Sequence, residues 1–538
     1  MRRYVPVEYT AKGLPVIQWE KDQTEDAGLV KIDILGNRSL AVIRDALAAI
    51  AKQTGRTIEY ETWDPLSDAA TQDAIRRGDT IGCFYIESPA TRLLLRKLWT
   101  GMPPHRLAVA DVFDYLVMVS SLVRPATNPF VEDFIRRAQE DSCASWHHKL
   151  DGVLNETHGI MTYQEDVSKV AMALANFSVE DADQLRKIIS KKHKQRQLRD
   201  YYEQFCRGAQ KNGASPKIID KLWEMIMSFA GYSFCKPHSA SYAQVSFKSA
   251  YLRTHYPAEF IAAVISNQGG FYSTFAYLSE ARRMGLAILL PDINESEWAY
   301  RGEGERLRIG LMQVKTIPKE LGLRIVDERT KAGLYRSFQD FLQRVKPEPS
   351  HVRVLVRAGC CDSIAGELTR PALLWRLYAG SEIGSSHLPV PDDYSAVQKR
   401  AHEIESFGFL SSRHPLTLYR KQIARLRPVS ASRMHHYVGR RITMVGVLIT
   451  EKAAETKHGH AMEFITLEDV TALYDATLFP EVYRRCCHLL SPNRPYMVHG
   501  LVEESFGVVT LTVLDLQLLE LTMSGNRDQL AQHECVSD

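Results

Sequence analysis

The stretch Gly28-Leu-Val-Lys-Ile-Asp-Ile-Leu-Gly36 is the part of this chain from which its fold is interpreted. Apolar side chains fall on both sides of a strand-like alternation: Leu29, Val30, Ile32, Ile34 and Leu35. A short apolar run bounded by glycines predicts a strand that is buried on both faces.

Asp33 is the carboxylate inside this run, and a buried carboxylate is costly unless another group pairs with it. Lys31 lies two residues earlier, so on a strand it shares a face with Asp33. One interpretation is a structural ion pair between the two. The other is a divalent-cation site, because hard ions such as Mg²⁺ take oxygen ligands.

The composition indicates a multidomain globular protein. The chain has 538 residues, 45% hydrophobic and 24% charged residues, and a formal net charge of +3. Nucleic-acid affinity must therefore come from local basic patches. The nine cysteines include the adjacent pairs Cys360-Cys361 and Cys486-Cys487 and form no C-x-x-C motif, which favours reduced thiols over a zinc site or a disulfide framework. No signal peptide or membrane span is expected, so a soluble, cytoplasmic protein is predicted.

Two early segments follow this stretch. A helix is predicted from about Ser39 to Ala51, and Ile81–Ser88 is predicted as a short strand ending in Glu87-Ser88. The next helix opens at Pro89 and carries basic residues at Arg92, Arg96 and Lys97. Its start is interpreted either as a phosphate site at a helix N-terminus or as a capped surface helix.

The run Arg186–Arg199 is the clearest electrostatic signal. It contains no acid and seven basic residues: Arg186, Lys187, Lys191, Lys192, Lys194, Arg196 and Arg199. A solvated helix face normally intersperses acids, so a run without counter-charge favours phosphate binding. An ordinary surface run is the alternative.

A second cluster lies in Phe229–Tyr242, where aromatic residues and the trio Lys236, His238 and Ser239 fall within a dozen residues; the aromatics are Tyr232, Phe234 and Tyr242. Aromatic side chains can stack on bases while cationic ones reach phosphates. Ser239 is also a good N-cap for a helix running to about Arg253. His238 taken alone could be a packed, hydrogen-bonded core histidine, but the surrounding cluster argues against that interpretation.

The second half changes character twice. Residues 305–366 alternate helices with short turns such as Val314–Pro318, which can offer backbone N–H groups to phosphates. Residues 367–435 are helical, with an interruption at 380–393 that is the best linker candidate. From residue 437 five strands are predicted, with a helix at Pro480–Leu490 after the third, which is the order of an OB barrel. The strand runs are Arg441–Thr450, Glu463–Glu468, Ala472–Phe479, Tyr496–Glu503 and Val508–Leu514.

This barrel offers candidate contacts to single-stranded nucleic acid, namely Lys452, Lys457, Phe464, Tyr474 and Phe479. The alternative is that the aromatic residues belong to the barrel core, and core is favoured for at least one of Phe464 and Phe479.

Taken in order, these segments resemble the alpha subunit of bacterial DNA polymerase III, the C-family replicative polymerase, over essentially the whole chain. Gly28–Gly36 is similar to the palm strand that carries the family's third catalytic aspartate. Gly82–Ser88 and Arg124-Pro125 resemble the start of the fingers, and Gly159-Ile-Met-Thr-Tyr-Gln-Glu165 resembles the family's Tyr-Gln-Glu motif. The most characteristic runs are Gly231–Tyr242 and His255–Phe260.

The resemblance implies a multidomain, mainly α protein with an α/β palm remnant, helical fingers, a helix-hairpin-helix region and a C-terminal five-stranded OB-fold. The expected parts are the C-terminal part of a palm (1–45), fingers (46–280), the helix-hairpin-helix region (281–366), a helical linker (367–435), the OB-fold (436–518) and a disordered tail (519–538).

It also implies Mg²⁺-dependent, template-directed nucleotidyl transfer from a deoxynucleoside triphosphate to a primer 3′-hydroxyl at a two-metal site. Asp33 would be the metal ligand, with Lys31 beside it as the second catalytic residue. Nucleotide phosphates would contact Arg186, Lys187, Lys191, Lys192, Lys236, His238 and Ser239. DNA would contact Arg92, Arg124, Lys315, Lys452, Lys457 and Phe464.

The chain departs from the family pattern in several places. The two other palm aspartates are not found upstream of Asp33, since Asp22 and Asp26 lie in a polar stretch. One carboxylate cannot hold two Mg²⁺ ions, so the chain alone is expected to be inactive and to need a separate N-terminal half. The first helix-hairpin-helix turn has Thr316 where the family usually has glycine. The segment Ser385–Tyr394 shows no clear copy of the family's sliding-clamp motif. The family's tau-binding domain is also not found in the sequence.

Three alternatives stay open: a catalytically inactive DNA-binding remnant, part of an error-prone paralogue, and, as the weakest, a structural scaffold.

Overall fold

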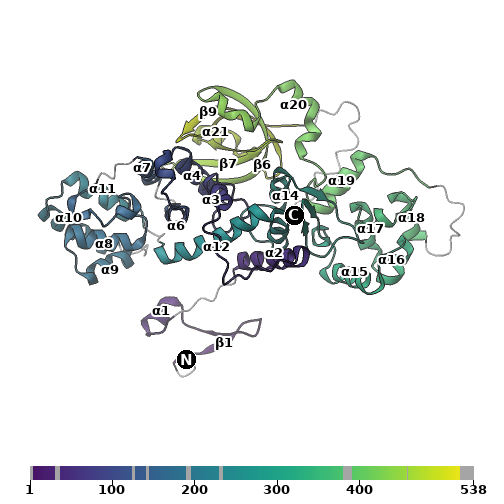
Figure 1. Ribbon diagram of the computed structural model, residues 1–538, viewed down its shortest axis with the longest axis horizontal. Coiled ribbons are helices and arrows are strands. Elements are labelled where there is room, and N and C mark those ends of the chain that lie inside the picture. The colour runs from purple at the N-terminus through teal and green to yellow at the C-terminus, as the bar shows by residue number, and fades with distance from the viewer. Residues whose placement is uncertain are drawn as a thin grey trace.

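The computed structural model describes residues 4–30, 37–123, 128–140, 145–189, 195–229, 234–379, 390–456 and 458–520. These residues form a mainly helical chain with a separate β-barrel that lies over the middle of the helical part (Figure 1). No described helix combines the length and apolarity that crossing a bilayer requires.

The N-terminal residues form a small unit that stands apart from the main body (Figure 1). It consists of the hairpin β1 (Val7–Tyr9) and β2 (Pro15–Ile17) followed by α1 (Lys21–Asp26). Several of its apolar side chains face solvent: Tyr4, Tyr9, Leu14, Val16, Leu29 and Val30.

The prediction of a buried strand at Gly28–Gly36 is wrong for the part that the structure describes. Gly28 has a positive φ of 77°, and Leu29 and Val30 belong to no strand, with Val30 84% exposed. A strand needs a neighbour for its backbone hydrogen bonds, and none of the described strands pairs with these residues. Residues 31–36, which include Lys31 and Asp33, lie outside the described residues.

The largest part of the chain is a helical body built around one apolar core. Its helices are α2 (Arg38–Thr54), α3 (Ala69–Arg76), α4 (Pro89–Thr100), α5 (Pro104–Leu107), α6 (Val112–Leu122), α7 (Asn128–Gln139), α8 (Gln164–Ala175), α9 (Val179–Ile189), α10 (Gln195–Lys211), α11 (Pro216–Met227), α12 (Lys236–His255), α13 (Pro257–Ser266) and α14 (Thr274–Arg283). α12 runs through the centre, while α8 to α11 form one end of the molecule (Figure 1). The predicted helix at 39–51 is confirmed as α2.

The predicted strand at Ile81–Ser88 is wrong, because this segment forms consecutive turns inside the helical core. Glu87 fixes them: its buried carboxylate accepts hydrogen bonds from the backbone N–H of Gly82 at 2.9 Å and of Phe271 at 2.6 Å, and from the Tyr277 hydroxyl at 2.9 Å. Burial raises the pKa of Glu87 despite these donors. The apolar side chains of the segment are buried because helices surround it, not because they belong to a sheet.

A second apolar cluster holds a helical lobe at the other end of the molecule (Figure 1). The lobe follows a small sheet of β3 (Ala287–Leu289), β4 (Arg301–Glu303) and β5 (Arg306–Arg308). Its helices are α15 (Lys319–Ala332), α16 (Phe338–Val345), α17 (Pro349–Ala358) and α18 (Arg370–Ala379). The predicted alternation of helices and turns over 305–366 is confirmed from Leu311 onward, whereas Arg306–Arg308 forms the strand β5. α19 (Ala396–Phe407) and α20 (Arg420–Leu426) lead to the barrel.

The barrel confirms the five predicted strands. β6 (Arg441–Glu455), β7 (Ala461–Glu468), β8 (Leu473–Leu478), β9 (Pro495–Ser505) and β10 (Val508–Leu518) close in the order β10-β8-β7-β6-β9, with α21 (Pro480–Cys486) after the third strand. β8 and β10 pair in parallel, and the other strand pairs are antiparallel. This order is compatible with an OB-fold.

The barrel core corrects part of the aromatic assignment. Phe464 and Phe479 are each 45% exposed, so the prediction that at least one belongs to the core is wrong. Tyr474 is 3% exposed and lies in the barrel core, so it offers no stacking face to a ligand. In β8 alternate side chains face inward, which places Tyr474 inside the barrel.

Candidate functional site

The N-terminal end of α12 carries a line of aromatic rings. His238 and Tyr242 lie four residues apart on α12 and share a helix face, and Phe234 lies two residues before the helix begins. The rings of Phe234 and His238 lie nearly parallel with centroids 5.8 Å apart, and His238 and Tyr242 are 4.2 Å apart. Tyr85 meets Tyr242 edge to face at 5.1 Å. The line therefore continues from the helix into the turn segment around Tyr85.

The backbone of Tyr85, which lies beside this line of rings, is strained, because its φ is 68°. An aromatic residue in the left-handed region is uncommon and persists only where its surroundings impose it. Burial raises the pKa of the Tyr85 hydroxyl. Strain concentrated beside His238 and Tyr242 is typical of a functional site.

Tertiary structure joins this aromatic line to the Tyr-Gln-Glu segment. The backbone N–H of Gln164 donates to the carbonyl of Phe234 at 3.0 Å, and the N–H of Lys236 donates to the Glu165 carboxylate at 3.4 Å. The Lys236 ammonium lies 5.8 Å from the centre of the Tyr163 ring. Two segments separated by about seventy residues therefore form one surface.

Lys236 is ion-paired with Glu156, a partner that the sequence analysis did not foresee. The pair is half exposed, so a phosphate can compete for the ammonium without the cost of removing a buried partner. Glu156 lies in a 3-10 turn far from α12 in sequence, and no local pattern indicated this contact.

Ser239 has a different role from the one predicted. α12 begins at Lys236, with Cys235 as its N-cap residue, so the prediction of Ser239 as the cap is wrong. Pro237 in the first turn supplies the preset φ that starts a helix. The Ser239 side chain is fully buried, and its hydroxyl lies 2.6 Å from that of Ser121 in α6.

The positive charge of the run Arg186–Arg199 is partly neutralised by an acidic residue that lies just before it. Near the end of α9, Asp183 accepts from Arg186 at 2.7 Å and from Lys187 at 2.8 Å. Hydrogen bonds from Lys187 and Arg186 hold the pKa of Asp183 below its ordinary value. Spacings of three and four residues place such pairs on one helix face, so the absence of counter-charge was a wrong interpretation for these two residues. Lys191 and Lys192 lie outside the described residues.

The DNA-contact candidates occupy separate surfaces. Lys315 is exposed in the turn before α15, and its backbone N–H donates to the Ser406 carbonyl at 2.8 Å. On the barrel, Lys452 of β6 stands opposite Phe464 of β7, and both side chains are exposed. Arg124 and Lys457 lie outside the described residues.

Arg92 does not lie on an open surface. It lines an internal pocket where α4 meets α12, α14 and the barrel, and its Nε donates to the Gly78 carbonyl at 3.0 Å. The start of α4 is capped by Ser88, whose hydroxyl accepts from the Thr91 N–H at 3.3 Å. Capping is thus the interpretation of this helix start that the structure supports.

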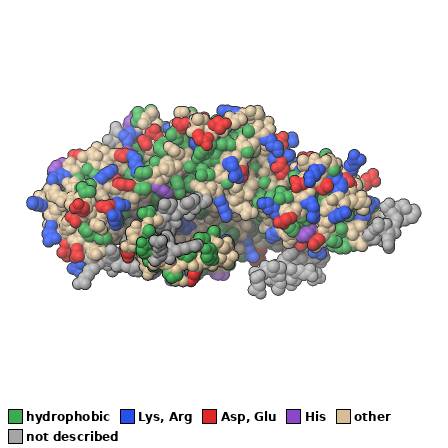
Figure 2. Space-filling view, turned by 90° about the horizontal axis from the view of Figure 1, so that it is seen from below, with side chains coloured by type: hydrophobic (Ala, Val, Ile, Leu, Met, Phe, Trp, Pro, Cys, Tyr) green, Lys and Arg blue, Asp and Glu red, His purple; other side chains and the backbone are tan. Residues whose placement is uncertain are grey.

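No group of three or more His, Cys, Asp or Glu side chains suited to a metal ion occurs in the described part of the chain. Asp33, the predicted ligand, lies outside that part. The face of the molecule in Figure 2 carries acidic and basic side chains side by side, so cationic charge is not concentrated there.

Comparison with known proteins gives two family matches. Residues 39–213 match the family described as the bacterial DNA polymerase III alpha subunit finger domain. Residues 285–372 match a helix-hairpin-helix motif.

Curated relatives align over nearly the whole chain. An error-prone DNA polymerase of Symbiobacterium thermophilum is 30% identical over 96% of this chain and 52% of its own length. The DNA polymerase III subunit alpha of Staphylococcus aureus is 30% identical over 96% and 48%, and that of Aquifex aeolicus is 32% identical over 93% and 43%. The chain thus spans about half the length of these relatives. Over nearly its whole length the chain is therefore similar to bacterial DNA polymerase III alpha subunits.

Proposed function

We propose that this chain takes part in template-directed DNA synthesis, supplying the fingers, the helix-hairpin-helix region and the barrel of a DNA polymerase III alpha-type enzyme. The observation that carries the proposal is the surface where α12 meets the Tyr163–Glu165 segment. It combines stacked aromatic rings with a half-exposed lysine, and it lies in a chain similar to these subunits. Aromatic faces stack on bases while lysine neutralises phosphate.

Each part has a distinct task in this proposal. His238 and Tyr242 present ring faces to the incoming nucleotide, and Lys236 exchanges Glu156 for a phosphate oxygen. Arg186 and Lys187 contribute charge from α9, together with Lys191 and Lys192. Ser239 supports this surface from beneath through Ser121 rather than by contacting the nucleotide.

The division of the chain is proposed along the lines expected from its sequence: 1–45, 46–280, 281–366, 367–435 and 436–518. Three apolar clusters, centred on the helical body, on the helix-hairpin-helix lobe and on the barrel, support three of these parts, and the first extends to Val445, Val447 and Ile449 where the barrel packs on the helices.

Mg²⁺ is the proposed cofactor, with Asp33 as one ligand and Lys31 beside it. When bound, the metal would activate the primer hydroxyl and stabilise the leaving phosphate oxygens. Further carboxylates are required, and we propose that a polypeptide segment corresponding to the other half of the relatives supplies them. The exposed apolar side chains of residues 4–30 support this, because apolar surface of this kind marks an interaction site.

Primer extension tests the proposal. Residues 1–538 are assayed with Mg²⁺ and the four deoxynucleotides, first alone and then with the candidate N-terminal half. Extension is expected only in the mixture, and Asp33→Asn is expected to abolish it while Asp26→Asn, in the exposed turn that ends α1, retains it.

The opposite result has a definite meaning. If neither sample extends the primer but DNA binding persists, the chain is a DNA-binding protein without catalysis. The exposed pair of Lys452 and Phe464 favours that second candidate, because binding by the barrel does not require metal.

A further inference from the structure

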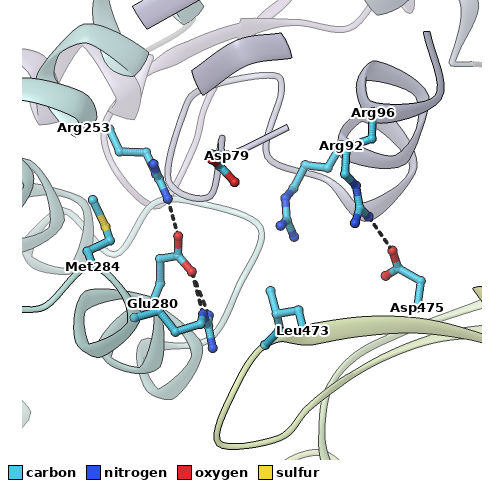
Figure 3. Close-up of a pocket in the computed structure, with 10 residues that line it drawn as sticks. Asp79, Arg92, Arg96, Arg253, Glu280, Met284, Leu473 and Asp475 are labelled. Carbon is cyan, nitrogen blue, oxygen red and sulfur yellow. Dashed lines mark hydrogen bonds and ion pairs between the residues drawn. The ribbon is translucent and has the colours of Figure 1, made fainter. Parts of the chain in front are cut away.

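A pocket of about 350 Å³ lies at the junction of the helical body and the barrel. Its walls come from α4, α12, α14 and the start of β8, which are far apart in sequence (Figure 3). Four arginines reach it, namely Arg92, Arg96, Arg253 and Arg283, against the carboxylates of Asp79, Glu280 and Asp475.

The carboxylates in this pocket are already engaged. Glu280 accepts from Arg253 and, at 2.8 Å, from Arg283. Asp475 of β8 accepts from Arg96 at 2.9 Å. Asp79 accepts from Arg77, which lies outside the pocket, at 2.9 Å. Figure 3 shows the ion pairs of Glu280 and of Asp475 and draws none for Arg92.

Arg92 is the arginine that has no carboxylate within ion-pair distance in the described part of the chain. Its Nε donates to the Gly78 carbonyl and its Nη1 lies 3.4 Å from the Tyr272 hydroxyl, so both of these acceptors are neutral. A guanidinium stays protonated at any physiological pH and presents five donors. Burial disfavours its charge, and the carboxylates of Glu280 and Asp475 offset this from beyond ion-pair distance, so the pKa of Arg92 stays raised while its donors contact no anion among the described residues.

A second observation points the same way. The Nε of Arg96 is buried and has no hydrogen-bond partner. Arg96 lies one helical turn after Arg92 on α4, so both guanidinium groups reach the same cavity. An unsatisfied donor beside a guanidinium that contacts no described carboxylate is what an anion with several acceptor oxygens would fill.

From this arrangement we propose that the junction pocket binds a phosphate group. Arg92 contacts its oxygens directly, and Arg96 shares its donors between the phosphate and Asp475. The volume exceeds that of a single phosphate and allows pyrophosphate or one backbone phosphate of a DNA strand. Because the site joins α4 to β8, an occupant would hold the barrel against the helical body. The site is independent of the polymerase activity proposed above.

Calorimetric titration of the full chain with sodium pyrophosphate, without Mg²⁺ or primer, tests this. We expect saturable binding of pyrophosphate at one site. Arg92→Gln is expected to bind pyrophosphate about tenfold more weakly, or weaker still, because a charge-assisted contact is lost. Arg376→Gln, an exposed arginine on α18, is the matched control and is expected to leave the affinity unchanged.

A second variant separates binding from misfolding. Asp475→Asn removes the competing carboxylate from Arg96 and is expected to strengthen pyrophosphate binding, which a damaged fold would not do. Asparagine still accepts the hydrogen bond that Asp475 receives from Thr466 at 2.8 Å.

The source of the phosphate is settled by a competition arm with oligo(dT). Displacement of pyrophosphate by the oligonucleotide, with loss of both in Arg92→Gln, assigns the pocket to a DNA backbone phosphate. Pyrophosphate binding that oligo(dT) does not displace assigns it to a free phosphoanion. If neither ligand binds in an Arg92-dependent way, the proposal is overturned, whatever primer extension shows.

Discussion

Lys452 and Phe464 stand directly opposite each other on the antiparallel strands β6 and β7, and both side chains are exposed. Directly opposed residues project from the same face of a sheet, with Cβ atoms about 5 Å apart. A cation beside an exposed aromatic ring can hold a phosphate while the ring stacks on the adjoining base.

We therefore expect Phe464→Ala to weaken binding of single-stranded DNA by about 1 to 3 kcal/mol, the range for a stacked base. Fluorescence anisotropy with labelled oligo(dT) measures this. Val470→Ala is the matched control, since Val470 is 62% exposed in the turn after β7 but has no ring to stack. Equal affinities for the two variants would remove this face from the DNA path.

The carboxylate of Asp183 partly neutralises the basic end of α9. Asp183→Asn releases Arg186 and Lys187, so binding of nucleotide or DNA phosphates is expected to become tighter. The slope of log affinity against log salt concentration should steepen by up to about one unit for each further phosphate that these side chains neutralise. Titrations at several salt concentrations give this slope. Asp220→Asn, exposed on α11, is the control, and an unchanged slope in Asp183→Asn would indicate an ordinary surface run.

Thr316 occupies a backbone conformation that favours glycine, with a φ of 67° in the turn before α15. The left-handed region costs a side-chain-bearing residue about 1 to 2 kcal/mol, and glycine loses part of this advantage through its greater freedom when unfolded. Thr316→Gly is expected to stabilise the chain by up to about 1 kcal/mol in urea unfolding.

The same substitution at a helical site is expected to lower the free energy of unfolding instead of raising it. Thr330→Gly, on an exposed position within α15, should destabilise by about 0.5 kcal/mol or more. Destabilisation by both variants would mean that the Thr316 side chain makes a contact worth more than its strain.

Glu280 is the buried centre of an ion-pair network that holds α12 and α14 together. Burial alone would raise its pKa, but Arg253 and Arg283 outweigh that effect and lower it from 4.5 to about 2. A lowered folded-state pKa means that the unfolded chain binds the proton more tightly. Its stabilisation is thus complete above about pH 4.5 and is lost as pH falls toward 2.

Glu280→Gln leaves Arg253 buried without its charge partner and should cost about 3 kcal/mol or more at neutral pH. The pH dependence of unfolding between pH 4.5 and 2 should flatten at the same time, as urea titrations at several pH values would record. Glu203→Gln removes an exposed partner of Arg199 and is expected to change stability by less than about 0.5 kcal/mol. Similar effects from both variants would contradict a buried network at Glu280.

Local sequence patterns sufficed to predict the helices and strands that form because of nearby residues. Alternation with period two located the five barrel strands, and helical spacing located α2 and the helices of the helix-hairpin-helix lobe, because each pattern follows from backbone geometry alone. Pro89 and Ser88 likewise marked the start of α4 through capping. The motifs also sufficed to indicate the family.

Tertiary structure decided what depends on distant partners. Ile81–Ser88 has the apolar content of a strand, but a core of helices buries it and Glu87 holds it in turns through Phe271 and Tyr277. Arg92 looks like a surface cation in sequence, yet the packing of the barrel on α4 encloses it. Burial and ion pairing depend on residues hundreds of positions away, and a local pattern carries no information about them.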